Sequence, residues 1–135
     1  MEAMGALLVR EARLIEALRT VVERYVGAQE PVAAGAALSA LGARLRQRIH
    51  LEESALFPAI ERRVGEPRFE PTARMRRQHA VLLELLGGIE QALQEGRIAA
   101  AAGDLRELKA ALRAHVEEEE RVILPLVEGA DGSLT

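Results

Sequence analysis

Apolar residues recur every three or four positions through most of this chain, a spacing that predicts amphipathic helices. The pattern predicts four of them, over residues 3–26, 32–64, 72–94 and 98–125. Short polar or glycine-containing segments separate these helices, and Pro58 is expected to bend the end of the second. Four long helices joined by short connections predict an all-α fold, an antiparallel up-down-up-down four-helix bundle.

The apolar spacing also predicts which residues the first and fourth helices bury in the core. The first helix is expected to bury Leu8, Ala12, Ile15, Leu18, Val22 and Tyr25. The fourth is expected to bury Leu105, Leu108, Leu112, His115, Glu119, Val122 and Leu126. The bundle should form one domain over residues 1–128, followed by a flexible C-terminal tail over 129–135.

The amino-acid composition limits which metal ligands and partners the protein can have. Aromatic residues make up 2 % of the 135 residues, and the chain has no cysteine, so any metal must be held by nitrogen and oxygen. The net charge of −3, without a basic stripe, gives no reason to expect nucleic acid as a partner. No segment has the pattern of a signal peptide or the length of a membrane span, so we expect a cytoplasmic protein with no membrane partner.

Ionisable residues stand where these helices should bury apolar ones. His115 and Glu119 lie one turn apart on the inward face of the fourth helix. The other interruptions are Arg48 and Glu52 in the second helix and His79 in the third. Burying such groups costs several kcal/mol unless each has a partner. The pattern therefore predicts a metal site or a polar network in the core.

The two halves of the chain resemble each other at an offset of 67 residues. This offset pairs Pro58 with Pro125, Glu52 with Glu119, Ala12 with His79 and Arg48 with His115. Two intact half-sites would offer four imidazoles and two carboxylates, enough for two carboxylate-bridged metal ions. Because Ala12 and Arg48 replace two of the imidazoles, the chain retains ligands for about one ion.

These motifs resemble the hemerythrin-like (HHE cation-binding) family over residues 7–127. Residues 52–58 look like its helix-two motif, Gln78-His79 like its helix-three motif and residues 115–125 like its helix-four motif. At Ala12 and at Arg48, family members typically have histidine. The resemblance implies a di-iron centre with a role in oxygen or nitric oxide binding, sensing or iron handling.

Carried over to this chain, the resemblance makes His79 and His115 terminal ligands of one iron and Glu52 and Glu119 the bridging carboxylates. Our hypothesis is a degenerate site that holds at most one non-haem metal ion through His79, His115 and Glu119, with Glu52 as a fourth ligand. Iron is the first candidate, with zinc and manganese as alternatives, and the role would be small-molecule (O2/NO) binding, sensing or iron handling. A homodimer is compatible with this hypothesis.

The sequence is also compatible with other functions and with another position for Arg48. The protein would be a metal-free structural or interaction bundle if Arg48 replaces the lost metal by pairing with Glu52 and Glu119. Alternatively, Arg48 extends to the bundle surface. A redox or iron-donating enzyme is a third class, and it requires an exchangeable metal.

The sequence also leads to predictions about the surroundings of Ala12 and His50. At Ala12, either neighbouring side chains collapse into the space of the missing imidazole or a pocket remains that admits water or a diatomic molecule. Collapse is the commoner outcome. His50 lies two residues from Glu52, about 200° around the helix, so we expect it on the surface rather than in the site.

Overall fold

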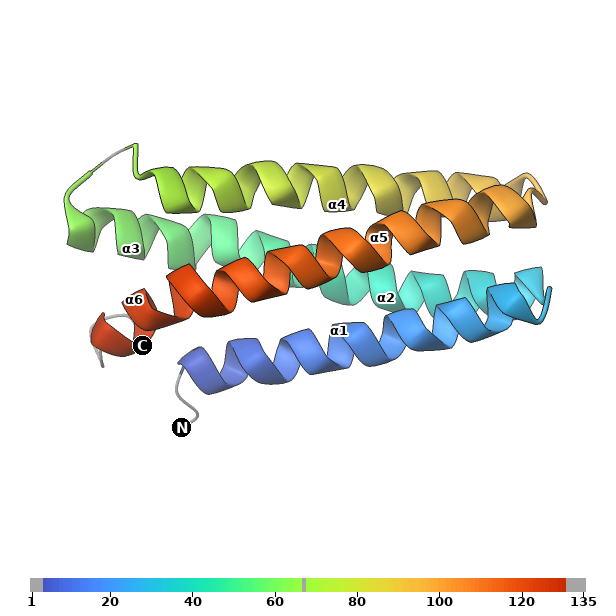
Figure 1. The fold of residues 1–135 in the computed structure, drawn as a ribbon, viewed down its shortest axis with the longest axis horizontal. Coiled ribbons are helices and arrows are strands. Elements are labelled where there is room, and N and C mark those ends of the chain that lie inside the picture. The colour runs from blue at the N-terminus through green and yellow to red at the C-terminus, as the bar shows by residue number, and fades with distance from the viewer. Residues whose placement is uncertain (1–3, 67, 131–135) are drawn as a thin grey trace.

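Long helices lying side by side make up the computed structural model, which describes residues 4–66 and 68–130 (Figure 1). The elements are α1 (Met4–Gly27), α2 (Pro31–Leu51), η1 (Glu52–Leu56), α3 (Phe57–Val64), α4 (Glu70–Gln94), α5 (Ile98–Glu118), η2 (Glu119–Ile123) and α6 (Leu124–Ala130). The all-α prediction is confirmed, and four long helical segments are consistent with the expected bundle. From residue 131 onward, the tail expected over 129–135 lies outside the described residues, and α6 runs to Ala130.

The helix ends follow from local chemistry. Gly65 ends α3 with φ of 82°, a left-handed conformation that glycine adopts without a steric penalty. The next helix begins at Glu70, two residues before the expected start, because Pro71 fits the first helical turn. Thr72 is buried there, and its hydroxyl bonds the Phe69 carbonyl at 3.0 Å.

Two π-helical turns, η1 and η2, interrupt the long helices. Each begins at a glutamate, Glu52 or Glu119, and the second starts 67 residues after the first. Each is followed by a proline, Pro58 or Pro125, near the start of the next α-helix. Since proline has no N–H for an i→i−4 bond, a wider turn before it avoids an unpaired carbonyl and a clash.

The second π turn corrects the expected face of the last helix. We predicted that Val122 and Leu126 would be buried, but both are half-buried, and Ile123 and Val127 fill the core instead. A π turn contains more residues than an α turn, so the residue four positions after Glu119 faces inward. The predicted end at Pro125 was also wrong, because the helix resumes after the π turn.

The face of α1 also differs from the prediction. Ala12, Leu18 and Tyr25 are half-buried, whereas Arg19 and Val26 are buried. After Ile15 the buried stripe continues at Arg19, Val22 and Val26, with spacings of four, three and four residues. Arg19 fits into it because its guanidinium pairs with two acidic neighbours on the same helix. These are Glu16 at 2.7 Å and Glu23 at 2.5 Å.

The apolar core forms two clusters with polar residues between them. The larger contains Leu45, Ile49, Leu82 and Leu112, and the smaller contains Leu56, Phe57, Met75 and Ile123. Along three of the long helices, the buried charged residues fall between the members of the two clusters. The apolar packing on both sides thus holds a polar layer in the interior.

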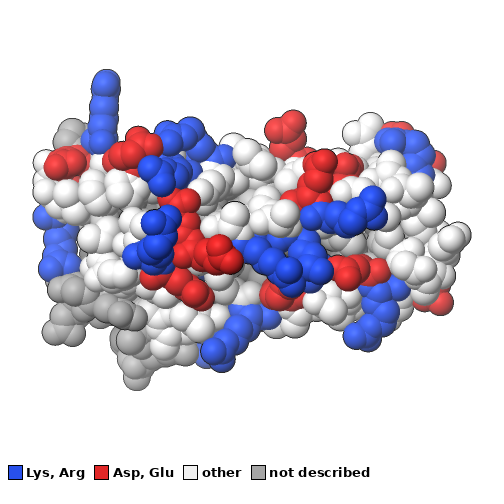
Figure 2. Space-filling model, viewed as in Figure 1, with Lys and Arg blue, Asp and Glu red and all other residues white. Residues whose placement is uncertain are grey.

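Charged side chains of both signs are interspersed on the face shown in Figure 2. Some of the surface charges pair across helices, as Arg46 does with Glu90 at 2.8 Å and Arg74 with Glu118 at 2.8 Å. No helix within residues 4–66 and 68–130 is long and apolar enough to cross a membrane.

Truncation of Leu86, which is fully buried in the larger cluster, should lower the free energy of unfolding. We expect Leu86→Ala to cost about 2–5 kcal/mol because it removes buried surface and leaves a cavity. Val81 on the same helix is 50 % exposed, so Val81→Ala should change stability by less than about 1 kcal/mol. Urea unfolding followed by circular dichroism measures both, and equal losses would contradict this packing.

Candidate metal centre

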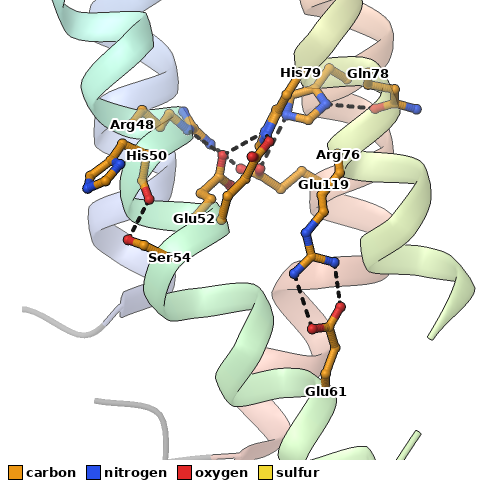
Figure 3. Close-up of polar contacts among 11 residues, drawn as sticks. Arg48, His50, Glu52, Ser54, Glu61, Arg76, Gln78, His79 and Glu119 are labelled. Atoms are coloured by element: carbon orange, nitrogen blue, oxygen red, sulfur yellow. Dashed lines mark hydrogen bonds and ion pairs between the residues drawn. The ribbon is translucent and has the colours of Figure 1, made fainter. Parts of the chain in front are cut away.

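Five ionisable side chains meet in the polar layer, each less than 10 % exposed. They are Arg48 on α2, Glu52 on η1, His79 on α4, His115 on α5 and Glu119 on η2. Figure 3 shows Arg48, Glu52, His79 and Glu119 pointing toward one another from separate helical segments. The helix periodicity that buries the apolar stripe also brings these charged groups together.

Three of the predicted ligands lie close enough to share one ion. Glu52, His79 and His115 each offer a ligand atom, and these atoms all lie within 4.8 Å of one another. The two imidazole rings have their centroids 4.9 Å apart and are tilted by 57°. A carboxylate and two imidazoles form a donor set suited to iron, manganese or zinc.

Glu119 was predicted as one of the three main ligands, with Glu52 as the fourth, but the structure places Glu52 with the two histidines and engages Glu119 differently. Glu119 accepts a hydrogen bond on Oε1 from Nη2 of Arg48, and its Oε2 lies 3.6 Å from Nε2 of His115. Arg48 also lies within ion-pair distance of Glu52, with 3.7 Å between Nε and Oε1. Arg48 is therefore a buried cation beside both carboxylates, and the alternative that it extends to the surface is wrong.

Hydrogen bonds outside the layer fix the orientation of His115. Gln78 donates from its amide nitrogen to Glu118 at 2.6 Å, so its amide oxygen is free to accept from Nδ1 of His115 at 2.7 Å. In the neutral ring, this places the proton on Nδ1 and leaves the lone pair of Nε2 directed into the layer. Metal-binding histidines are commonly held in this way.

Glu53 orients His79 in the same manner. Its carboxylate lies 2.6 Å from Nδ1 of His79 and can only accept, so Nδ1 is the donor. The ring stacks on Phe57 with centroids 5.6 Å apart and planes inclined by 17°. The Nε2 atom then faces Oε1 of Glu52 at 3.1 Å.

Burial changes the protonation of the layer. It lowers the pKa of His79, against the opposing effect of Glu53, and it lowers the pKa of His115 to about 4. Burial also raises the pKa of Glu119 to about 8, and the adjacent Glu52 carboxyl adds to this shift. Neutral His79, with its proton on Nδ1, presents the lone pair of Nε2 to Oε1 of Glu52.

Three buried polar atoms of the layer have no hydrogen-bond partner among the described residues. They are Oε2 of Glu52, Oε2 of Glu119 and Nε of Arg48. Two of these atoms are acceptors, and they add to the two imidazole lone pairs directed inward. Arg48 contacts both carboxyl groups but leaves these oxygens and imidazole nitrogens without a partner. A metal ion fits this set of donor atoms.

Residues next to the predicted ligands complete the site, and the inward-face pattern did not identify them. Glu53 follows Glu52 and Gln78 precedes His79, and their place beside a ligand within the family-like motifs was the signal available for each. His50 is exposed, as expected, and its carbonyl accepts a hydrogen bond from Ser54 (Figure 3).

A pocket of about 560 Å³ lies beside Ala12 and reaches the polar layer. Its lining includes Arg48, Glu52, His79 and His115. Collapse, the commoner outcome for a missing side chain, has therefore not filled the space at Ala12. The site is connected to the outside by this pocket.

His115 should keep its proton on Nδ1 and stay neutral in metal-free protein until the pH falls to about 4. Since an unfolded histidine gains its proton near pH 6.5, His115 stabilises the fold above that value and loses this contribution toward pH 4. Glu119 acts in the opposite direction because its pKa is raised, so NMR is a cleaner readout than melting.

Long-range ¹H–¹⁵N spectra report the tautomer directly. Gln78→Leu, which removes the acceptor for Nδ1–H, should release the preference for one tautomer. A proton on Nε2 of His115 in the unmodified chain at neutral pH would contradict the assignment.

Comparison with known proteins agrees with this geometry. The family model "Hemerythrin HHE cation binding domain" matches residues 9–127, which is most of the chain. Searches of curated proteins and of solved structures found no match. The family match confirms the resemblance seen in the sequence motifs: this chain belongs to the hemerythrin HHE cation-binding domain family.

Proposed function

We propose that this protein binds one non-haem metal ion, with iron as the first candidate, through Glu52, His79 and His115. The observation that carries the proposal is the convergence of three ligand atoms within 4.8 Å, with each imidazole held by a partner on its Nδ1. Glu119 is a further ligand in this proposal, because its Oε2 is unpaired and lies 3.6 Å from Nε2 of His115.

The proposal is limited to one ion because the first half of the chain lacks both of its imidazoles. We propose that the two helix pairs of an antiparallel bundle are repeats related by the offset of 67 residues. The matched π turns that begin at Glu52 and Glu119 support this relation. In that frame Arg48 takes the place of a histidine, and its guanidinium supplies a positive charge beside the carboxylates.

The protein's own residues would prepare the site for binding rather than for turnover. Glu53 and Gln78 hold the two rings, Arg48 places a permanent positive charge beside Glu119, and apolar clusters lie on either side of the site. A bound ion would supply a Lewis acid with open coordination positions for a small molecule such as O2 or NO. Binding, sensing or iron handling is the role that this arrangement supports best.

One observation favours a second candidate, a metal-free structural or interaction bundle. Arg48 already contacts Glu119 directly and lies 3.7 Å from Glu52, so its permanent positive charge meets part of the need for a metal. In this case the histidines would serve only as hydrogen-bonded core residues. Metal content separates the two candidates.

A cytoplasmic location and a homodimer are further proposals from the sequence. A redox or iron-donating activity belongs with them, since it requires the same exchangeable ion. Cell fractionation, sedimentation and assays of the metal-loaded protein would test these in turn.

Metal content per chain should be about one when the untagged protein is produced with supplemented iron, manganese and zinc and purified without chelator. Inductively coupled plasma mass spectrometry measures this ratio. His115→Ala should abolish binding because it removes one of the three convergent ligands. His50→Ala is the matched control, since His50 is exposed and lies outside the cluster, and it should leave the ratio unchanged.

Metal-to-chain ratios near zero or near two would each contradict the proposal. A ratio near zero would reject the metal-binding proposal and leave the bundle in which Arg48 is the permanent cation. A ratio of about two would show that a second ion is held despite Ala12 and Arg48, which the proposal excludes.

A further inference from the structure

The pocket beside Ala12 is much larger than a diatomic ligand requires. Its volume of about 560 Å³ lies within the roughly 300–1,000 Å³ range of sites for small organic molecules. One water takes up only about 30 Å³ in the liquid. Access to the polar layer for O2 or NO therefore does not account for the size of this pocket.

Most of the surface that lines the pocket is apolar, although charged residues and histidines also line it. The aliphatic residues come from α1, α2, α4 and α5 and include Val9, Ile15, Leu45, Ile49, Leu82, Leu112 and Val116. Such a lining suits an apolar ligand body.

Two of the charged residues that line the pocket, Arg48 and Glu52, each have an unpaired polar atom. Nε of Arg48 is a donor and Oε2 of Glu52 is an acceptor, and neither has a hydrogen-bond partner among the described residues. Arg48 is 7 % exposed and Glu52 is 1 % exposed, so water outside the bundle does not compensate either atom freely. A ligand that fills the pocket would gain most from a head with one acceptor and one N–H donor.

The charges around Arg48 and Glu52 indicate a neutral ligand. Arg48 faces two carboxyl groups, Glu52 and Glu119, so an anionic head would add a third acceptor group to this pair. At the mouth, the arginines on α1 and α5 are offset by acidic residues. The charged lining there consists of Arg13, Glu16, Arg113, Glu117 and Glu120.

We propose that this pocket binds a small neutral molecule with an apolar body and an azole or carboxamide head. Its acceptor atom takes the hydrogen bond from Nε of Arg48, and its N–H donates to Oε2 of Glu52. The aliphatic walls enclose the body, which lies in the space opened by Ala12. The pocket shares Glu52 with the proposed metal centre, but it is present in the metal-free protein, so the inference goes beyond the proposed function and is tested separately from it.

Benzimidazole is a suitable probe because it joins an apolar ring system to an azole that is neutral at neutral pH. We expect saturable binding to chelator-treated protein by calorimetry, with NMR shifts at the methyl groups of Leu45, Leu82 and Leu112. Indole has a similar shape and an N–H but no acceptor nitrogen, so it should bind about tenfold more weakly. Benzoate, an anion of similar size, should not bind.

Ala12→Leu fills the pocket and should abolish binding of benzimidazole. Ala17→Leu adds the same volume at an exposed position of the same helix and should not affect it. Equal affinity in a folded Ala12→Leu variant, absence of saturable binding, or binding of benzoate as tight as that of benzimidazole would each overturn the proposal.

The methyl shifts decide the question if Ala12→Leu does not fold. Shifts confined to the residues that line the pocket in the unmodified chain support the assignment. Shifts centred on the smaller pocket at the opposite end of the bundle, near Val32 and Leu93, would reject it. Because every titration uses metal-free protein, the outcome is independent of the metal content of the purified chain.

Discussion

The buried contact between Arg48 and Glu119 sets the charge balance on which the core depends. A buried charge that loses its partner typically costs about 3–5 kcal/mol, so neither residue can be lost alone without a large penalty. Beside this pair, Oε2 of Glu52 is buried without a hydrogen-bond partner among the described residues. The metal proposal and the pocket proposal each supply a partner for this oxygen, a metal ion in the first and an N–H donor in the second.

The π turns connect this chemistry to the fold. Each begins at a carboxylate of the polar layer and precedes a proline, so the backbone widens at the points where Glu52 and Glu119 enter the core. Wide turns of this kind are found often at functional sites. Packing of Phe57 on the ring of His79 ties the first π turn to α4, so the position of one ligand depends on the segment that carries another.

Much of this could be predicted from the sequence, because burial of an apolar stripe has a strict period. That period identified the helices and placed His79, His115, Glu52 and Glu119 inside, where all four are found. The period assumes a regular α-helix, however, so it could not foresee that a π turn would move Ile123 inward in place of Val122. Nor does it describe side-chain direction, which is why the bonds of Glu53 and Gln78 to the histidines and the open space at Ala12 became visible only in three dimensions.

The most direct test of the claim that Arg48 stands where a second metal ion would bind is the metal content of the double variant Ala12→His, Arg48→His. Restoring both imidazoles should raise the content from about one ion per chain to about two, with an optical spectrum of a carboxylate-bridged di-iron pair after loading with iron. A content that stays at about one, in a variant with unchanged helical circular dichroism, would contradict the claim and show that the two half-sites do not face each other as the repeat requires.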